Sequence, residues 1–390
     1  MRMVVAILAI TCCLAVPIKA QTTDEPDTNR LRAVATVALP PAKVPYRLER
    51  LGGDYRAPWS MAFLPDGRIL LVEKRGGLNL VNPVTGASDP MVGGPDNVLR
   101  SADSGLLDVA LDPDFEANQR IFLAFAEGSR EENQLAIWRA RLVDDRLVGG
   151  EVIFRLGETK AEPSHPGGRL LFLPDKTLLA TVGDGYDYKE KAQDPGSLLG
   201  KVIRLDRDGK VPADNPFIGV EGYAPEIWTM GHRNIQGLAI DRKTGNVWAS
   251  EHGPWGGDEI NLLAAGKNYG WPMATFGIDY DGKLISERLH IDGMQRPELV
   301  WSPSIGASGL AFYRGSRFPE LDGTMLAGGL TSRSVMWLSF ARQSGLWVER
   351  ARYFGEFGWR IRDIREAPDG RIYILTDDNE QGQLLRLMPG

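Results

Sequence analysis

Three short polar segments between residues 231 and 272 carry side chains suited to chemistry. They are GHRN (231–234), EHGPWGGDEIN (251–261) and NYGWP (268–272). A cation, carboxylates, imidazoles and glycines alternate here with short apolar strands. Binding residues gather on loops when a rigid scaffold positions them, so we interpret this region as a site assembled on loops.

Two further segments offer reactive or charged groups. His165 stands in the loop-like segment SHPGGRL (164–170), and a neutral imidazole can accept a proton near neutral pH. Arg360 and Arg362 are two residues apart, which on a strand places both guanidinium groups on one face. Planar guanidinium groups suit carboxylates. Taken alone, the histidine also fits a surface residue, and the arginine pair also fits a solvated strand face.

The elements that must position these residues are short strands that follow turns. Apolar runs at 69–72, 178–182, 247–250 and 372–375 each follow a turn signal, and no long amphipathic helix separates them. This pattern predicts an all-β architecture. The segments PDGRILLVEKRGGLNLV and PDGRIYILTDDNEQGQLLRL also share an order of turn, strand, polar loop and strand, which is typical of β-propellers. We therefore predict a six-bladed β-propeller with four-stranded antiparallel blades; the alternative is a large β-sandwich or a pair of barrels.

The amino terminus indicates export. Residues 1–20 have a positive residue, an apolar run and a small residue before a polar stretch, as in a secretory signal peptide. Residues 21–43 form a predicted flexible leader, and residues 44–390 a single propeller domain. We expect an exported, soluble, periplasmic protein. A lipoprotein signal is the alternative, since both cysteines, Cys12 and Cys13, lie in this segment.

Charge and cysteine content exclude several classes of protein. Loss of Arg2 and Lys19 with the signal peptide takes the net charge from −6 to −8. An acidic chain without a basic run is a poor candidate for nucleic-acid binding. A mature chain without cysteine has no disulfide, thiolate catalyst or cysteine-ligated metal. We expect no stable membrane insertion, because no segment after the leader is a long unbroken apolar run.

Several motifs resemble one known family. WSMAFLPDG (59–67), GLLDVALDPDF (105–115) and the 231–272 region are similar to the soluble glucose/sorbosone dehydrogenases, above all the periplasmic aldose sugar dehydrogenases. The resemblance covers the chain from about residue 45. It implies a six-bladed propeller that holds pyrroloquinoline quinone (PQQ) and Ca²⁺ at one end of its axis. The implied activity oxidises aldose sugars at the anomeric carbon to lactones, with hydride transfer to the quinone and a separate electron acceptor.

The resemblance also implies roles for individual residues. His165 would be the general base and Arg233 a catalytic cation beside the quinone, although Arg233 could instead pair with a carboxylate such as Glu251. His232 and His252 fit structural roles better than catalytic ones. The further residues implied to contact PQQ are Asp103, Asn234, Tyr280, Thr331, Ser332, Arg333, Arg360, Ile361 and Arg362.

Calcium ligands are implied in the same way. The carbonyls of Gly253 and Pro254 match the family's ligands to the Ca²⁺ that contacts PQQ, because calcium accepts backbone oxygens. Glu259 and the carbonyl of Tyr269 match a second, structural Ca²⁺ site, with Asp279 as a weaker candidate. Two other acidic segments, 206–209 and 377–380, lack calcium-loop spacing, and we predict solvated turns there.

Two departures from the family pattern leave cofactor affinity and sugar preference open. Thr331 stands where glucose dehydrogenases have lysine, so Arg333 could hold one PQQ carboxylate instead. Asp103 stands where relatives have glutamine, and a carboxylate there would repel an anionic cofactor unless it is paired or protonated. The alternative functions are a calcium-dependent, lactonase-like propeller hydrolase and a non-catalytic sugar-binding propeller. A monomer and a homodimer both fit the sequence.

Overall fold

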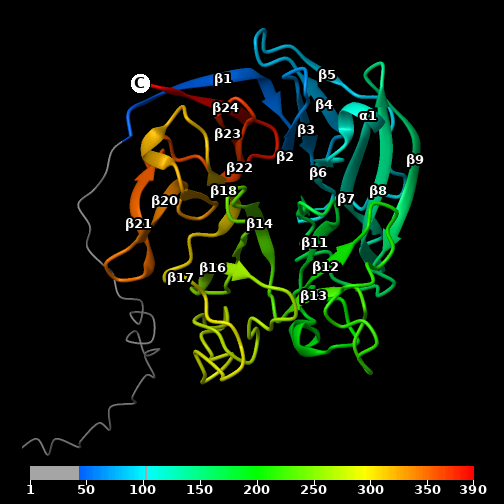
Figure 1. Cartoon of the computed structure of the whole chain (residues 1–390), viewed down its shortest axis with the longest axis vertical. Helices are drawn as coiled ribbons and strands as arrows, with labels where there is room; N and C mark the ends of the chain where they lie inside the picture. Colours follow the sequence, from blue (N-terminus) through cyan, green and yellow to red (C-terminus); the bar gives the residue numbers. More distant parts are fainter. Residues whose placement is uncertain (1–43, 102) are drawn as a thin grey trace, which may run out of the picture.

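The computed structural model describes residues 44–101 and 103–390. Six four-stranded antiparallel sheets surround a central axis (Figure 1). The predicted six-bladed β-propeller is therefore confirmed, and the sandwich and paired-barrel alternatives are wrong. The predicted signal peptide (1–20) and leader (21–43) lie outside the described residues, as do both cysteines, so these predictions stay predictions.

The first three blades follow the chain order. Blade 1 consists of β2 (Pro58–Phe63), β3 (Ile69–Glu73), β4 (Leu78–Val81) and β5 (Ser88–Pro90). Blade 2 consists of β6 (Leu106–Leu111), β7 (Arg120–Gly128), β8 (Asn133–Val143) and β9 (Arg146–Arg155). Blade 3 consists of β10 (Leu170–Phe172), β11 (Leu178–Val182), β12 (Lys201–Leu205) and β13 (Ile227–Met230).

The other three blades complete the ring. Blade 4 consists of β14 (Ile235–Ile240), β15 (Val247–Glu251), β16 (Asp258–Leu263) and β17 (Leu299–Trp301). Blade 5 consists of β18 (Ala307–Tyr313), β19 (Thr324–Gly329), β20 (Ser334–Ala341) and β21 (Leu346–Tyr353). Blade 6 consists of β22 (Ile361–Glu366), β23 (Ile372–Thr376), β24 (Gly382–Pro389) and β1 (Tyr46–Tyr55).

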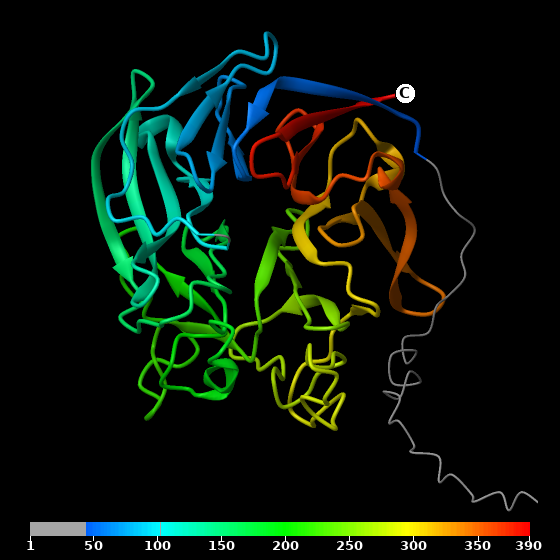
Figure 2. The same ribbon diagram turned by 180° about the vertical axis from the view of Figure 1, so that it is seen from behind.

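Blade 6 joins the two ends of the described chain. β1 pairs antiparallel with β24, with Tyr46 opposite Pro389 and Leu51 opposite Leu384. Figure 2 shows the same closure from behind, with β1 on the outer side of β24. This pairing completes the sixth sheet and covers the edge that β24 would otherwise expose.

Helices are few and short among the described residues. They are α1 (Phe115–Asn118) and the 3₁₀ helices η2 (Lys189–Gln193), η3 (Pro319–Leu321) and η4 (Gly355–Phe357). None of the helices in this part of the chain is long and apolar enough to cross a membrane.

The repeated turn before each middle strand has a local cause. In blade 1, the Asp66 carboxylate accepts the backbone N–H of Arg68, and Gly67 has a φ of 88°. In blade 6, Asp369 accepts the N–H of Arg371 in the same way. Asp favours such turns because its side chain bonds its own backbone two residues on, and glycine tolerates a left-handed φ. The repeated PDG phrase therefore predicts the correct hairpin in both blades.

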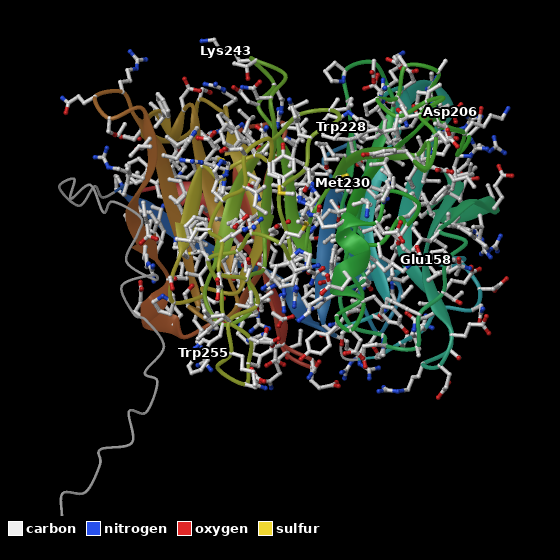
Figure 3. The ribbon with its side chains drawn as sticks, turned by 90° about the horizontal axis from the view of Figure 1, so that it is seen from below. Glu158, Asp206, Trp228, Met230, Lys243 and Trp255 are labelled. Carbon is white, nitrogen blue, oxygen red and sulfur yellow. The ribbon has the colours of Figure 1, made fainter. Side chains whose placement is uncertain are left out.

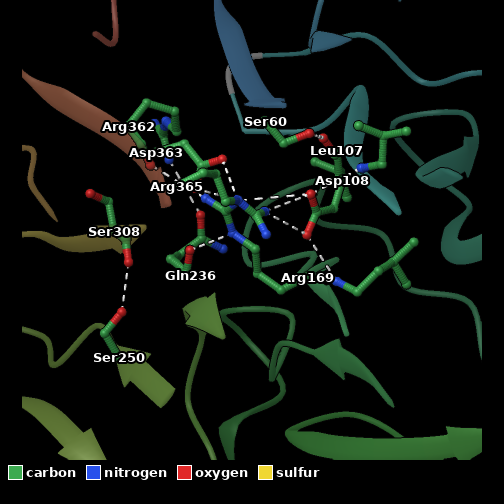
Figure 4. A network of polar contacts seen from close by, with 12 residues as sticks. Ser60, Leu107, Asp108, Arg169, Gln236, Ser250, Ser308, Arg362, Asp363 and Arg365 are labelled. Atoms are coloured by element: carbon green, nitrogen blue, oxygen red, sulfur yellow. Dashed lines mark hydrogen bonds and ion pairs between the residues drawn. The ribbon is translucent and has the colours of Figure 1, made fainter. Parts of the chain in front are cut away.

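A buried polar network crosses the propeller axis (Figure 4). Arg169, which directly precedes β10, bonds Asp363 of β22 at 2.9 Å and the carbonyl of Gln236 in β14 at 2.5 Å. Arg365 of β22 bonds both Asp363 and Asp108 of β6, each at 2.9 Å. Because two arginines face two aspartates, the buried charges are paired, as burial requires. The network fixes the starts of the inner strands of four blades.

Candidate active site

The candidate site lies at one end of the axis. In Figure 3, Trp255 lies at the opposite end of the molecule from Lys243 and Asp206. Next to it, Pro254 helps to line a pocket of about 300 Å³ together with Asp184, Arg233 and other residues. The rest of the lining is Tyr186, Asp187, Lys189, Trp271, Asp279, Tyr280 and Ile285.

His165 forms a tight pair with Asp184, one of the residues that line this pocket. The His165 Nδ1 atom lies 2.7 Å from Asp184 Oδ1, and the ring meets Tyr186 edge to face at 5.1 Å. The histidine side chain is 13% exposed and Asp184 only 1%. His165 has a φ of 49°, and a Cβ on Gly183 would lie 2.1 Å from its carbonyl oxygen. Glycine at position 183 therefore allows the two loops to approach.

The surroundings of His165 favour the neutral imidazole. Burial lowers the pKa of His165, and the charge of Arg233 lowers it further, while Asp184 opposes both effects. In the neutral ring, Nδ1–H donates a hydrogen bond to the Asp184 carboxylate, so the free lone pair is on Nε2. A neutral, oriented imidazole of this kind can act as a general base.

Arg233 lies between the histidine and the loop after β15. Its guanidinium donates to the carbonyl of Gly253 at 3.1 Å and to the Tyr280 hydroxyl at 3.3 Å. Glu251 instead hydrogen-bonds His232 at 3.0 Å, so the alternative ion pair between the Arg233 guanidinium and Glu251 does not form. Asn234 is buried beside Arg233 and accepts from Gln236 at 3.1 Å.

Of the predicted carbonyl ligands Gly253 and Pro254, Pro254 lines this pocket and Gly253 directly precedes it in the chain. The Gly253 carbonyl already accepts Arg233, and its N–H donates to Asp258 Oδ1 at 2.8 Å. A Cβ on Gly253 would lie 2.2 Å from the Gly256 carbonyl, so the turn requires glycine. The backbone oxygens of this turn have the chemistry that calcium prefers.

Arg360 and Arg362 both face one carboxylate. Arg360 Nε and Arg362 Nη2 each lie 2.9 Å from Asp377. The two arginines lower the pKa of Asp377 against the opposing effect of burial. The prediction of a solvated turn is therefore wrong for Asp377, whose side chain is 16% exposed. Ile361 is fully buried in the core, so its side chain does not reach the pocket.

The loop after β19 lies beside Arg360. Arg360 Nη1 contacts the Leu330 carbonyl at 3.4 Å, and Thr331 and Arg333 are exposed next to it. Ser332 is half-buried, and its N–H donates to the Ile305 carbonyl. The cations at 333, 360 and 362 thus come from two adjacent blades.

Asp103 is exposed, and its negative charge acts on three neighbouring groups. It raises the pKa of His165, Lys74 and Lys160 against stronger opposing effects of burial. Burial lowers the pKa of Lys74 and of Lys160 to about 8. Lys74 and Lys160 are therefore close enough to Asp103 for its charge to act on them.

Glu259 and Tyr269 are buried and are not among the residues that line the pocket. Glu259 stands opposite Glu251 across the β15–β16 ladder, and burial raises its pKa well above the usual range. Asn261 donates to Glu259 at 3.1 Å, while the buried Asn261 Oδ1 has no hydrogen-bond partner among the described residues. An oxygen-rich region with an orphaned acceptor fits an oxygen-ligated cation. Asp279 instead pairs with Lys189 at 3.6 Å.

A metal site built from side chains alone is not present in the described part of the chain. No group of three or more His, Cys, Asp or Glu residues there is arranged to hold a metal ion. The predicted calcium ligands include backbone carbonyls, which calcium accepts.

Comparisons with known proteins agree with the fold. A family model described as Glucose / Sorbosone dehydrogenase matches residues 55–386. The chain belongs to the glucose/sorbosone dehydrogenase family. Aldose sugar dehydrogenase YliI of Escherichia coli (strain K12) is 38% identical to it over 358 residues, which cover 90% of this chain and 95% of the relative.

Solved structures of dehydrogenases from this family superimpose closely. The apo form of the soluble aldose sugar dehydrogenase of Escherichia coli matches with a TM-score of 0.84 and 37% identity, over 88% of this chain and 100% of the other. The PQQ-bound form of the aldose sugar dehydrogenase of Streptomyces coelicolor matches with a TM-score of 0.73 and 27% identity, over 90% and 100%.

In this glucose/sorbosone dehydrogenase family member, sequence reasoning missed three residues of the site. Asp184 orients His165, Asp377 joins Arg360 and Arg362, and the Gln236 amide contacts both Asn234 and Arg362. The sequence contained one signal for the first of them. Asp184 stands between two glycines directly after the strand predicted at 178–182, a loop position from which a carboxylate can reach a neighbour.

Proposed function

We propose that the chain is a PQQ-dependent aldose dehydrogenase that oxidises sugars at the anomeric carbon to lactones. The observation that carries this proposal is the pairing of His165 with Asp184 beside Arg233, at the same end of the axis as Arg360 and Arg362. The base and the anion-binding cations of a quinone-dependent sugar oxidation are thus near each other. Family membership and the PQQ-bound relative support the same assignment.

The donor groups at the site suit PQQ, a planar quinone with three carboxylates. Arg333, Arg360 and Arg362 would hold its carboxylates, since guanidinium groups bind them bidentately. The Gly253 and Pro254 carbonyls would hold the Ca²⁺ that accompanies it. When bound, PQQ supplies the two-electron acceptor for the hydride that leaves the sugar's anomeric carbon.

The chain's own residues would handle the proton. Nε2 of His165 would take the proton of the anomeric hydroxyl, leaving a positive imidazolium. Asp184 stabilises that charge and holds the ring through Nδ1, at 2.7 Å. Arg233 would stabilise negative charge that develops on the acceptor side of the pocket.

The first test is reconstitution of the purified protein. We expect the apoprotein to bind PQQ in the presence of Ca²⁺, and the loaded protein to reduce an artificial dye when glucose or another aldose is added. His165→Gln should abolish dye reduction without preventing PQQ binding, and His290→Gln, which changes a histidine paired with Asp292, should behave as the wild type.

Other outcomes distinguish the alternatives. Protein that binds no PQQ but hydrolyses a lactone with Ca²⁺ would contradict the proposal and favour the propeller hydrolase. Binding of sugar without oxidation by any acceptor would favour the non-catalytic sugar-binding propeller. Export to the periplasm, the identity of the separate electron acceptor, and the choice between monomer and homodimer stay predictions from the sequence.

A further inference from the structure

Trp271 contacts both halves of the proposed catalytic machinery. Its indole Nε1–H donates to Asp184 Oδ2 at 2.8 Å, and its ring centroid lies 5.5 Å from the guanidinium carbon of Arg233. A cation within about 6 Å of an indole face is attracted by the ring. The side chain is 6% exposed and lines the pocket. One residue therefore contacts the carboxylate that holds the base and packs against the cation.

The backbone of Trp271 is firmly held. Its N–H donates to the Gly231 carbonyl at 3.0 Å, and its carbonyl accepts Gln193 Nε2 at 2.7 Å. Gln193 and Asn268 also exchange two amide hydrogen bonds, at 3.1 and 2.7 Å. A Cβ on Gly231 would lie 2.2 Å from Asn268 Oδ1. The motifs GHRN and NYGWP are thus locked together, which fixes where the indole can point.

We propose that Trp271 is a positioning residue that joins the His165–Asp184 pair and Arg233 into one rigid unit. This inference rests on the proposed function for the roles of His165 and Arg233. The indole acts through its neighbours and transfers no proton itself. Its N–H holds the second carboxylate oxygen of Asp184, while its ring limits where Arg233 can move.

The hydrogen bond from Trp271 also sets how strongly Asp184 supports a charged His165. Asp184 accepts His165 and the Tyr186 N–H at Oδ1, and Trp271 at Oδ2. Loss of the indole donor would leave the negative charge of Asp184 less stabilised. The Asp184 carboxylate would then favour the imidazolium form of His165 more strongly. The other charged or titratable groups near His165 include Asp103, Arg233, His252, Tyr186 and Lys160.

The test measures His165 directly in the protein without added cofactor. Ring signals of the four histidines are followed by NMR as a function of pH, and His165→Gln assigns the signal of interest. In Trp271→Phe, which keeps a ring but loses the donor, we expect the pKa of His165 to rise by about one unit. In the PQQ-loaded enzyme we expect kcat to fall about tenfold. The acid limb of its pH profile should move to higher pH by about one unit, as the pKa of His165 does.

Trp337→Phe is the matched control. Trp337 is also buried, and an arginine, Arg350, also lies over its ring, at 5.8 Å. Its Nε1 has no hydrogen-bond partner among the described residues, so this variant loses packing alone. We expect it to leave the pKa of His165 unchanged.

Two results would overturn the inference. One is a Trp271→Phe protein that folds normally and has an unchanged pKa at His165. The other is an equal shift in Trp337→Phe, since that would indicate a general effect of losing an indole. A shift specific to Trp271→Phe in a protein that shows no PQQ-dependent sugar oxidation would uphold the link to Asp184 while contradicting the proposed function.

Discussion

Two histidine–carboxylate pairs with the same sequence separation have different surroundings. His165 and Asp184 are 19 residues apart and 2.7 Å from each other; His232 and Glu251 are also 19 residues apart, at 3.0 Å. The first pair lies at the pocket, with the His165 side chain 13% exposed. The second pair is buried and does not line the pocket, with the His232 side chain 0% exposed.

The difference lies in the remaining ring nitrogen. Nε2 of His232 is bonded to the Thr229 hydroxyl at 2.9 Å, and the ring stacks on Tyr269. Both nitrogens of His232 are therefore used to hold the protein together. For His165, only Nδ1 has a hydrogen-bond partner among residues 44–101 and 103–390, and Nε2 is left as the basic atom. A histidine–carboxylate pair is thus a candidate for catalysis only where one nitrogen remains accessible to substrate.

Separate replacement of His165 and of His232 by glutamine should give the largest contrast, one variant losing activity and the other stability. His165→Gln should lower kcat by about 10³-fold, because it removes the proton acceptor. Its loss of stability should be the smaller of the two, because the His165 ring makes one hydrogen bond and the His232 ring makes two. His232→Gln should lower the free energy of unfolding by about 1–3 kcal/mol, because buried partners lose hydrogen bonds. Steady-state kinetics and chemical denaturation of both variants measure the contrast. A stable, fully active His165→Gln protein would break it.

Replacement of Asp184, the carboxylate of the first pair, should have the next largest effect on kcat. In Asp184→Asn, the amide would donate to Nδ1 and move the ring proton to Nε2, so the base would be in the wrong tautomer. We expect kcat to fall by about 10²-fold while the apoprotein still binds PQQ. The measurement is kcat beside the dissociation constant for PQQ. If the affinity for PQQ fell by the same factor as kcat, the substitution would have disrupted the site as a whole.

Arg233 connects the two pairs, because it follows His232 in the chain and its charge acts on His165. Arg233→Lys keeps the charge but loses the planar group that contacts Gly253, Tyr280 and the Trp271 ring. We expect kcat to fall about tenfold, less than for loss of the charge. Arg233→Met provides the comparison. If kcat were no higher in Arg233→Lys than in Arg233→Met, the positive charge at this position would not contribute to catalysis.

The smallest expected effect is the dependence of kcat/KM on pH. His165 must be neutral to accept a proton, and burial, helped by Arg233, lowers its pKa below the usual 6.5. The neutral form therefore persists below pH 6.5, and activity should fall only under more acidic conditions. The acid limb of kcat/KM against pH measures this. A limb above pH 6.5 would mean that Asp184 outweighs burial and would contradict the account of His165.

Local turn chemistry made much of the fold predictable. The strands expected at 69–72, 178–182, 247–250 and 372–375 are the cores of β3, β11, β15 and β23. Each is fixed by a neighbouring turn and by apolar residues close in sequence. The pairing of β1 with β24 has no such local signal, because it depends on where the whole ring closes.

The site was predictable where a motif is contiguous and unpredictable where partners are distant. Arg360 and Arg362 lie together as the strand pattern required, but their shared partner Asp377 is 15 residues beyond Arg362 and resembled a solvated turn. Asp184 and Trp271 meet across 87 residues, a contact that no spacing rule gives. Ile361 was named with its neighbours, yet strand alternation turns its side chain into the core.

The central claim is that this propeller uses His165 to oxidise an aldose with PQQ. The most direct measurement loads the protein with PQQ and Ca²⁺, excludes oxygen and dyes, adds an aldose, and follows the absorbance of the bound cofactor. We predict stoichiometric reduction in the wild type and in folded His232→Gln, and bound but unreduced cofactor in His165→Gln. Reduction at the wild-type rate in His165→Gln, or none in the wild type with any aldose, would contradict the claim.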